Sequence, residues 1–263
     1  MTSSTAALRA PVLLEHLRWS DGYLAPFTTA SGACSSSIDH PEGYSLWSLV
    51  AKLDPGAELA WDEVHGDELV YVERGSLTVD DGRTCGSGGT VLIEAGVSTR
   101  VRATQQTELV HFGPWEPGPV TDGELGAPAA PGHIVHVTDR DGIAAVDADG
   151  VRVVFHADST CPTCRVTLLW NHAAEPRTTA SHTHSADEII HVTKGEIQAG
   201  RLNVKAGMAV AVAAGVRYGF RSSGYEFVNY RQNASYRSKH GQPPLLEVAD
   251  PTLVEEWAAA HPS

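Results

Sequence analysis

The sequence lacks the features of nucleic-acid-binding and membrane proteins. It has no cluster of Lys and Arg, and its formal net charge is -13 over 263 residues, whereas nucleic-acid-binding domains usually carry a basic patch or stripe. No apolar run approaches the roughly 20 residues that span a bilayer. The first 19 residues show no basic flank followed by a long apolar segment, as a signal peptide would. We therefore expect a cytoplasmic protein that binds neither nucleic acid nor membranes.

Cysteine is also scarce, with four in the chain. Cys161 and Cys164 form one C-x-x-C pair, and no second pair supplies the other two ligands of a structural zinc site. A redox pair usually begins a helix that follows a strand, whereas the flanks of this pair have the pattern of strand and turn. We expect both cysteines to be structural.

Helical periodicity is nearly absent, and short apolar or alternating runs separated by Gly, Asp and Pro dominate the sequence. Many short strands with regular turns predict a sandwich or a barrel. One helix is expected at the end of the chain, in residues 251–263, where Thr252 can cap the segment Leu253–Ala260. The predicted strands are Ser45–Leu53, Leu69–Glu73, Thr90–Ile93, Thr107–Phe112, Val151–His156, Val166–Trp170, Ile189–Thr193, Met208–Ala213 and Tyr225–Tyr230.

The chain divides into two related halves. Pro and Gly crowd residues 116–132 without periodicity, which predicts a linker between domains at 1–115 and 133–250. At an offset of 120 residues the two halves repeat, and with a one-residue slip the run from 88 to 96 matches 207 to 215. The repeat predicts a duplicated domain of ordinary size. The matched pairs are Ala60 with Ala180, Asp67 with Asp187, Glu68 with Glu188 and Gly75 with Gly195.

The second half contains a candidate metal site. His182 and His184 are two residues apart, so on a strand both imidazoles point to one face. Glu188 keeps the same parity and can join them. Two imidazoles and one carboxylate suit Fe(II), Mn, Co, Ni or Zn and leave positions open for water or substrate. His191 has the other parity and is not expected to face the metal.

This pattern resembles the first motif of the cupin superfamily, H-x-H, three or four residues, E, six residues and G. Here it reads His182-Thr183-His184, Glu188 and Gly195. The second motif, G, five residues, P-x-G, two residues and H, is matched by Gly207 and Gly215, with Ala213 in place of proline and Tyr218 in place of the histidine. The resemblance implies an all-β chain with two cupin barrels (double-stranded β-helix, jelly-roll) in tandem, followed by the short C-terminal helix.

Tyr218 stands where the family has a fourth metal ligand. An ionised phenol can bind a metal, although the unperturbed pKa of tyrosine is about 10. A neutral phenol would instead donate a hydrogen bond, or act as a general acid or base over an open coordination position. Tyr218 can equally be a wall residue of the barrel. All three roles stay open from the sequence.

The first half has lost the corresponding site. At the offset of the repeat, Asp62, Val64 and Glu68 align with the ligand positions, and Thr99 aligns with Tyr218. Val64 cannot bind a metal, so no metal is expected there. His65 is adjacent, but its parity aims it at the other face, and we expect a surface or loop histidine.

The resemblance implies a metal-dependent protein that binds a small organic molecule. We expect one divalent metal, with Fe(II) favoured, and an oxidoreductase of the non-haem iron dioxygenase type, with Tyr218 as a catalytic residue. Arg231 is expected to pair with a substrate carboxylate and Phe220 to line an apolar pocket. Two alternatives remain: a non-oxidative isomerase, cyclase or lyase in which the metal is a Lewis acid, and a non-catalytic ligand-binding protein. A homodimer is common among similar proteins.

Overall fold

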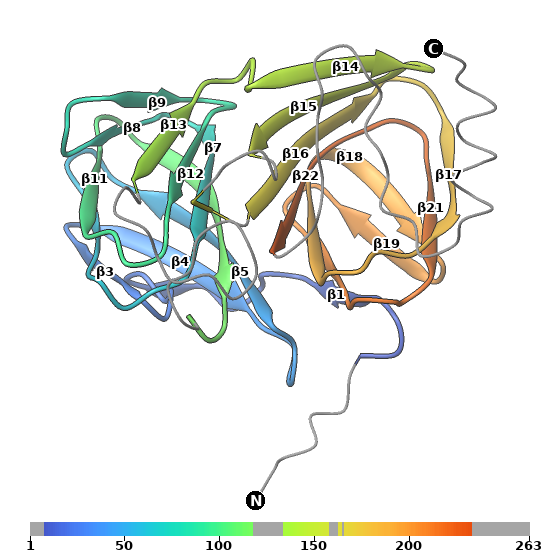
Figure 1. Ribbon diagram of the computed structural model, residues 1–263, viewed down its shortest axis with the longest axis horizontal. Helices are drawn as coiled ribbons and strands as arrows, with labels where there is room; N and C mark the ends of the chain where they lie inside the picture. The colour runs from blue at the N-terminus through green and yellow to red at the C-terminus, as the bar shows by residue number, and fades with distance from the viewer. Residues whose placement is uncertain (1–7, 118–133, 158–162, 165, 233–263) are drawn as a thin grey trace, which may run out of the picture.

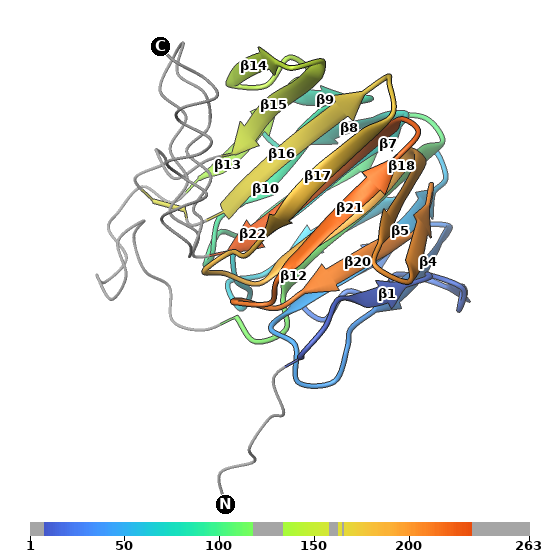
Figure 2. The same ribbon diagram turned by 90° about the vertical axis from the view of Figure 1, so that its right-hand side faces the viewer.

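The short apolar runs of the sequence form β-strands, and these close into two barrels that lie side by side (Figures 1 and 2). The computed structural model describes residues 8–117, 134–157, 163–164 and 166–232. The all-β prediction is confirmed, and each of the nine predicted strands overlaps an observed one. The predicted C-terminal helix, residues 251–263, lies outside the described residues. In the described part, no helix is long and apolar enough to cross a membrane.

The first barrel is built from a seven-stranded and a five-stranded antiparallel sheet. In β11 the buried Val101 alternates with the outward-facing Arg100 and Arg102, as the two-residue period of a strand requires. The inward side chains of both sheets form one core that includes Trp47 and Leu59. The strands are β2 (Ser20–Asp21), β3 (Thr28–Ser31), β4 (Cys34–Asp39), β5 (Leu46–Leu53), β6 (Glu58–Trp61), β7 (Glu68–Arg74), β8 (Ser76–Val79), β9 (Thr84–Gly86), β10 (Thr90–Ile93), β11 (Thr99–Ala103), β12 (Thr107–Pro114) and β13 (Val135–Thr138).

The second barrel is formed by one ten-stranded sheet that curls over itself. Its long strand β18 pairs with β20 and β22 near its start and with β19 and β21 near its end, so it belongs to both walls. The enclosed core includes Ile190, Val210 and Phe227. The strands are β1 (Val12–Leu14), β14 (Ala144–Ala148), β15 (Val151–Ala157), β16 (Val166–Ala173), β17 (Arg177–His182), β18 (Glu188–Ala199), β19 (Leu202–Lys205), β20 (Ala209–Val212), β21 (Tyr218–Ser222) and β22 (Tyr225–Gln232).

The two barrels exchange edge strands. The order β1-β20-β18-β22-β16-β15 in the second barrel repeats the order β13-β10-β7-β12-β5-β4 in the first. Strand β1 comes from the start of the chain but pairs with β20 of the second barrel, and β13 follows the predicted linker but pairs with β10 of the first. Each half therefore completes a sheet of the other. The domain boundaries at 115 and 133 stay a prediction, and strand pairing crosses both.

The seven-stranded sheet of the first barrel packs face to face on the ten-stranded sheet of the second across an apolar interface. One buried cluster joins Leu69 and Val110 of the first barrel to Ile189 and Val228 of the second. At its centre the rings of Phe112 and Tyr230 stack, with centroids 5.1 Å apart and planes 12° apart. Phe112 pairs with Leu69 and Tyr230 with Ile189, so equivalent residues of the two halves meet. The duplication therefore gives the interface an approximate two-fold relation.

The glycine that ends each motif has a steric role. Gly75 and Gly195 have φ angles of 91° and 73°, in the region that residues with a side chain avoid. A Cβ at Gly75 would stand 2.5 Å from the carbonyl oxygen of Gln106, and one at Gly195 would stand 2.3 Å from that of Gly224. Gly75 therefore allows the connection between β7 and β8, and Gly195 allows a bend within β18.

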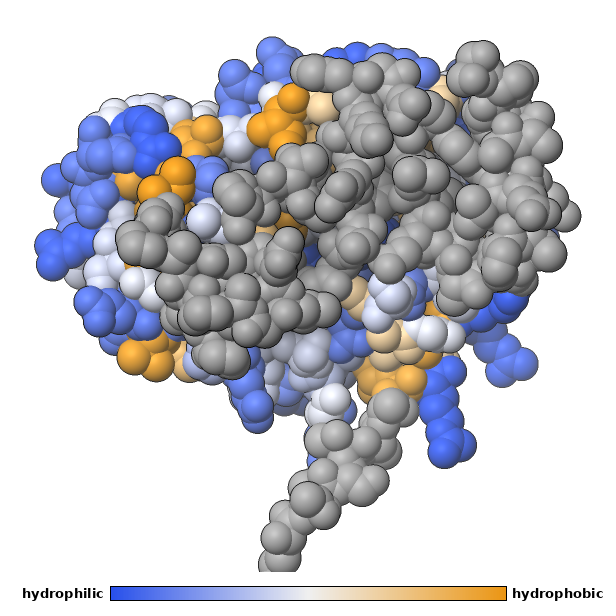
Figure 3. Space-filling view, viewed as in Figure 1, coloured by the Kyte–Doolittle hydropathy of each residue, from blue (hydrophilic) through white to orange (hydrophobic). Residues whose placement is uncertain are grey.

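The outer surface is largely hydrophilic on the face shown in Figure 3, where hydrophobic residues lie in small separate groups. The exposed large apolar residues of the described chain include Leu17, Val64, Trp115 and Ile143, which are far apart in the sequence. The broad apolar surfaces of the sheets are instead buried inside the barrels and between them.

A buried histidine pair also lies at the interface. The rings of His16, which follows β1, and His191 on β18 are 5.9 Å apart, and both side chains are buried. Asp39 contacts His16 and Glu73 contacts His191, at 3.4 Å in each case. Burial, followed by repulsion from His191, lowers the pKa of His16 from 6.5 to about 3. His191 thus points away from the motif face, as its parity predicted.

We predict that His16 makes the protein less stable in acid. The unfolded chain binds a proton at His16 near pH 6.5 and the folded chain only near pH 3, so the free energy of unfolding falls as the pH drops between these values. The variant His16→Gln lacks this contribution, and its loss of stability between pH 7 and pH 4.5 should be smaller by roughly 2 kcal/mol. Urea unfolding at the two pH values measures it. Equal losses in wild type and variant would contradict the assignment.

Candidate metal site

The predicted ligands of the second barrel come together at the ends of three strands. His182 ends β17, Glu188 begins β18 and Tyr218 begins β21, while His184 lies in the segment between β17 and β18. Tyr218 pairs directly with His182 in the β17–β21 ladder. The ring centroid of His182 is 4.8 Å from that of His184 and 4.6 Å from that of Tyr218. Strand pairing therefore joins His182 and Tyr218, and the segment after β17 brings His184 beside them.

The two histidines have the form that metal ligands need. His182 Nδ1 lies 2.8 Å from the carbonyl oxygen of Ala180, which as an acceptor favours a proton on Nδ1 and leaves Nε2 with a free lone pair. His184 is buried, and burial lowers its pKa from 6.5 to about 3, although the charge of Glu188 acts in the opposite direction. Neutral imidazole is the species that binds metals.

Glu188 is buried and oriented by two donors. Asn229 Nδ2 and Arg231 Nε both donate to its Oε2 atom, each at 2.8 Å. Burial alone would raise the pKa of Glu188, but Arg231, His184, Tyr218 and Asn229 together lower it from 4.5 to about 2. Its other oxygen, Oε1, lies 3.7 Å from His184 Nε2 and meets no donor at ordinary hydrogen-bond geometry among the described residues, although the phenol of Tyr218 is near enough to lower the pKa of Glu188 by a weak hydrogen bond. The carboxylate thus holds its charge and keeps one oxygen available.

Tyr218 is neutral in this arrangement. Burial, reinforced by the negative charge of Glu188, raises the pKa of its phenol well above 10. A neutral phenol is a hydrogen-bond donor and a weak acid rather than an anionic ligand. Of the three roles open from the sequence, this arrangement favours that of a neutral hydrogen-bond donor beside Glu188.

The two predicted substrate contacts differ in their surroundings. Arg231 on β22 is buried in the site, where its Nη2 atom lies 3.3 Å from His184 Nε2 in addition to its bond with Glu188. Phe220 on β21 is buried among aromatic residues, with its ring centroid 5.7 Å from Tyr225 and 5.8 Å from Phe227. Substrate contact by either residue stays a prediction.

The donor set fits a divalent metal, although it is not closed around one point. In the part of the chain that the structure describes, no three His, Cys, Asp or Glu side chains stand in a ready-made metal-binding arrangement. The chemistry is nevertheless suitable, since the buried Glu188 Oε1 lies 3.7 Å from the neutral imidazole of His184, with His182 in ring contact. To complete the site, Arg231 would have to release His184 Nε2.

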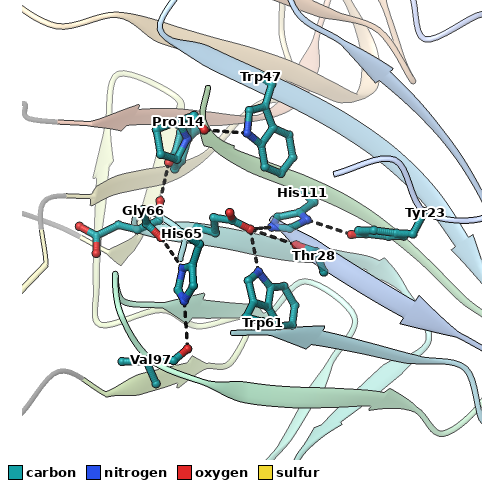
Figure 4. A network of polar contacts seen from close by, with 12 residues as sticks. Tyr23, Thr28, Trp47, Trp61, His65, Gly66, Val97, His111 and Pro114 are labelled. Carbon is teal, nitrogen blue, oxygen red and sulfur yellow. Dashed lines mark hydrogen bonds and ion pairs between the residues drawn. The ribbon is translucent and has the colours of Figure 1, made fainter. Parts of the chain in front are cut away.

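In the first barrel the equivalent carboxylate is held by protein donors, as Figure 4 shows for the residues around it. Trp61 Nε1 donates to Glu68 Oε2 at 2.7 Å, and Thr28 Oγ1 donates to the same oxygen at 3.2 Å. His111 Nε2 lies 2.9 Å from that oxygen, and its Nδ1 lies 2.9 Å from the hydroxyl of Tyr23. Glu68 is completely buried. The two donors and the imidazole all meet Oε2, whereas Oε1 has no hydrogen-bond partner among the described residues, as is also the case for Glu188 Oε1.

The strand register corrects the alignment of the two halves. Trp61 pairs with Thr99 as His182 pairs with Tyr218, so Trp61 rather than Asp62 takes the place of His182. Thr99 does correspond to Tyr218, and Val64 is 63% exposed. A one-residue shift in the loop before the glutamate explains the error, because the repeat was aligned at one constant offset.

His65 lies in the loop between β6 and β7, one of the two predicted alternatives, but it is not at the surface, since its side chain is 1% exposed. Its two ring nitrogens lie 2.6 Å from the carbonyl oxygen of Gly66 and 2.9 Å from that of Val97. The histidine therefore fixes the loop against the barrel, a role that depends on a segment 32 residues further along the chain.

One difference between the barrels lies on the strand opposite the glutamate. Gly113 pairs with Trp47 as Arg231 pairs with Thr167, so it occupies the position of Arg231. A Cβ at Gly113 would stand 2.5 Å from the Trp47 ring and 3.0 Å from Glu68 Cγ. The first barrel therefore has no room for a guanidinium at this position. The roles of Trp61, His111 and Gly113 were not predicted, because they depend on register across strands.

The predicted structural role of the cysteines is tested in part. Cys164 is 2% exposed and belongs to the apolar interface cluster, as a structural cysteine would. Cys161 lies outside the described residues.

No protein-family model matches the chain, and no curated protein matches it in sequence. Solved structures do match over most of its length. A protein from Pseudomonas aeruginosa described as glyoxylate-induced has a TM-score of 0.65 at 14% identity, covering 91% of this chain and 96% of its own. A protein from Nostoc punctiforme described as a dioxygenase has a TM-score of 0.62 at 10% identity, covering 88% of each chain. Oxalate decarboxylase from Bacillus subtilis, which has Mn(II) centres, has a TM-score of 0.59 at 13% identity, covering 90% and 80%.

These similarities show the fold. The chain is a two-barrel protein with the cupin fold, as the motif resemblance implied. Identities of 10% to 14% carry no activity from the neighbours to this chain.

We predict that Trp61 stabilises the buried carboxylate of the first barrel. Trp61→Phe removes the indole donor to Glu68 and should lower the free energy of unfolding by about 1–3 kcal/mol, the usual penalty for leaving a buried polar group unsatisfied. Trp115→Phe, at a tryptophan that is 42% exposed, is the matched control and should change stability by less than about 0.5 kcal/mol. Denaturant unfolding followed by circular dichroism measures both. Equal effects of the two substitutions would contradict the role of Trp61.

Proposed function

We propose that this protein is a metal-dependent enzyme whose single active site lies in the second barrel and acts on a small organic substrate. One observation carries the proposal: the ionised, buried Glu188 lies with its Oε1 atom 3.7 Å from the neutral His184, with His182 alongside. His182, His184 and Glu188 would hold one divalent ion. The cupin fold and the motif that spans these residues support this assignment.

The chain's own residues would prepare the site in two ways. Asn229 and Arg231 fix Glu188 Oε2, so that Oε1 faces the histidines. The carboxylate could then bind a metal ion without first changing its rotamer. Tyr218 keeps its proton and stands beside the carboxylate, where it can donate to a negative charge that develops on a bound substrate.

Charge favours an anionic substrate. In the metal-free site Glu188 and Arg231 form a neutral pair, so a divalent ion would leave the site with a net charge of about +2. The buried guanidinium of Arg231 would then pair with a carboxylate or enolate of the substrate, as the sequence suggested. A small hydroxy acid or diketone, able to bind through two oxygens, fits this description.

Two reaction types remain for such a site. With Fe(II), whose preferred donors include two histidines and a carboxylate, the bound ion would supply oxidation by dioxygen, and this is the reaction we favour. The neutral hydroxyl of Tyr218 supports a second candidate, a non-oxidative isomerase, cyclase or lyase that needs a proton donor. A homodimer and a cytoplasmic location remain part of the proposal.

We predict one divalent metal equivalent per chain. Titration of the metal-free full chain with Mn(II), Fe(II), Co(II), Ni(II) or Zn(II), followed by elemental analysis, should give about one equivalent for wild type. His184→Ala and Glu188→Gln should lower the affinity at least roughly tenfold, because each removes a ligand. His172→Ala, at a half-buried histidine of the same barrel whose nearest charged partner is Glu226, should leave binding unchanged.

Oxygen consumption with a panel of small hydroxy acids and diketones then separates the two reactions. Turnover that requires iron and dioxygen supports the oxidoreductase. Turnover under nitrogen with zinc or nickel supports the non-oxidative enzyme instead. Less than a tenth of an equivalent of metal after reconstitution would refute both and leave a ligand-binding protein.

A further inference from the structure

A tyrosine from the first barrel reaches into the wall of the second barrel's site. Tyr44 precedes β5, is 3% exposed, and donates its hydroxyl to the carbonyl oxygen of Glu188 at 2.5 Å. The same hydroxyl lies 3.0 Å from the carbonyl oxygen of Val212. Glu188 and Val212 are paired residues of β18 and β20. The phenol of Tyr44, from the first barrel, thus bridges two strands of the second barrel at Glu188, the candidate metal ligand.

The next residue extends this contact. Ser45 Oγ donates to Asp187 Oδ2, and Asp187 Oδ1 accepts from the backbone N–H of Ala214 at 2.8 Å. Asp187 directly precedes Glu188, and Ala214 lies in the turn that leads to Tyr218. Tyr44 and Ser45 therefore hold two consecutive residues at the start of β18, Asp187 and Glu188.

The reverse contact is also present. Tyr230 of the second barrel donates its hydroxyl to the carbonyl oxygen of Asp67 at 3.0 Å, and Gln232 Nε2 donates to the same oxygen at 2.7 Å. Asp67 precedes Glu68 as Asp187 precedes Glu188, and its Oδ1 accepts from the N–H of Ala95 at 2.8 Å. Each barrel therefore holds the glutamate segment of the other through a buried tyrosine.

We propose that Tyr44 is a positioning residue for the metal site, and that the first barrel, which lacks the ligand set itself, serves as the fixed support of the second barrel's Glu188. The proposal rests on the metal-binding function proposed above. Glu188 Oε1 is useful only if its backbone is held where Asn229 and Arg231 can orient the carboxylate. The hydroxyl of Tyr44 fixes that backbone from outside the barrel, across 144 residues of sequence.

The pair Tyr44→Phe and Tyr230→Phe tests this in the full-length chain. Each substitution removes one buried hydroxyl at the same interface and keeps the ring, so the two should lower the urea midpoint of unfolding to a similar extent. Mn(II) affinity, measured by electron paramagnetic resonance, should fall roughly tenfold in Tyr44→Phe. It should change by less than about twofold in Tyr230→Phe, because Tyr230 supports the barrel without the ligand set.

Hydrogen exchange of the metal-free proteins gives a second reading that needs no metal. The amides at the start of β18 should exchange faster in Tyr44→Phe, whereas those at the start of β7 should exchange faster in Tyr230→Phe. Wild-type Mn(II) affinity in Tyr44→Phe would overturn the positioning role while the proposed function stands. A wild-type chain that binds no metal would refute the proposed function and with it the role at the metal site. Unchanged exchange at β18 in Tyr44→Phe would also refute the support of Glu188.

Discussion

The burial of one carboxylate in each barrel is the constraint on which the rest of the structure depends. An ionised carboxylate removed from water is costly unless donors or cations surround it. Glu68 and Glu188 are both completely buried at equivalent positions, and each barrel satisfies its glutamate differently. In the first barrel Trp61 and Thr28 donate to Glu68 Oε2, beside His111. In the second, Arg231 and Asn229 donate to Glu188 Oε2, and Oε1 lies 3.7 Å from His184 Nε2. Among the described residues Oε1 of each glutamate meets no donor at ordinary hydrogen-bond geometry, so the two sites differ in the side chains around the carboxylate.

Duplication explains why both solutions exist in one chain. Two copies of a barrel begin with the same buried glutamate. In the first copy Gly113 lies so close to the Trp47 ring that no arginine equivalent to Arg231 fits there. The first copy remains useful through the interface, where strands are exchanged and Phe112 stacks on Tyr230. Its loss of the ligand set does not make it dispensable.

The sequence predicted those parts of the structure that depend on local pattern. Glu188 and its two histidines lie within seven residues, so their spacing alone predicted that they would lie near one another, although His184 lies between strands, where parity does not apply. Their role as metal ligands stays a prediction. Arg231 was singled out, but its bond to Glu188 joins strands 43 residues apart in the chain. The loop position of His65 was predicted, but its contact with the carbonyl oxygen of Val97, 32 residues further along the chain, was not. Cross-strand register and contacts between barrels, which also determine the position of Tyr44, have no signal in a single sequence.

Anomalous diffraction from crystals grown with Mn(II) tests the central claim most directly. The account predicts one strong peak per chain in the second barrel, within bonding distance of Glu188 Oε1 and of an imidazole nitrogen of His184, and no peak at Glu68. A peak beside Glu68 would contradict it. So would a second barrel without a metal peak at saturating Mn(II), with the Arg231 guanidinium still on His184.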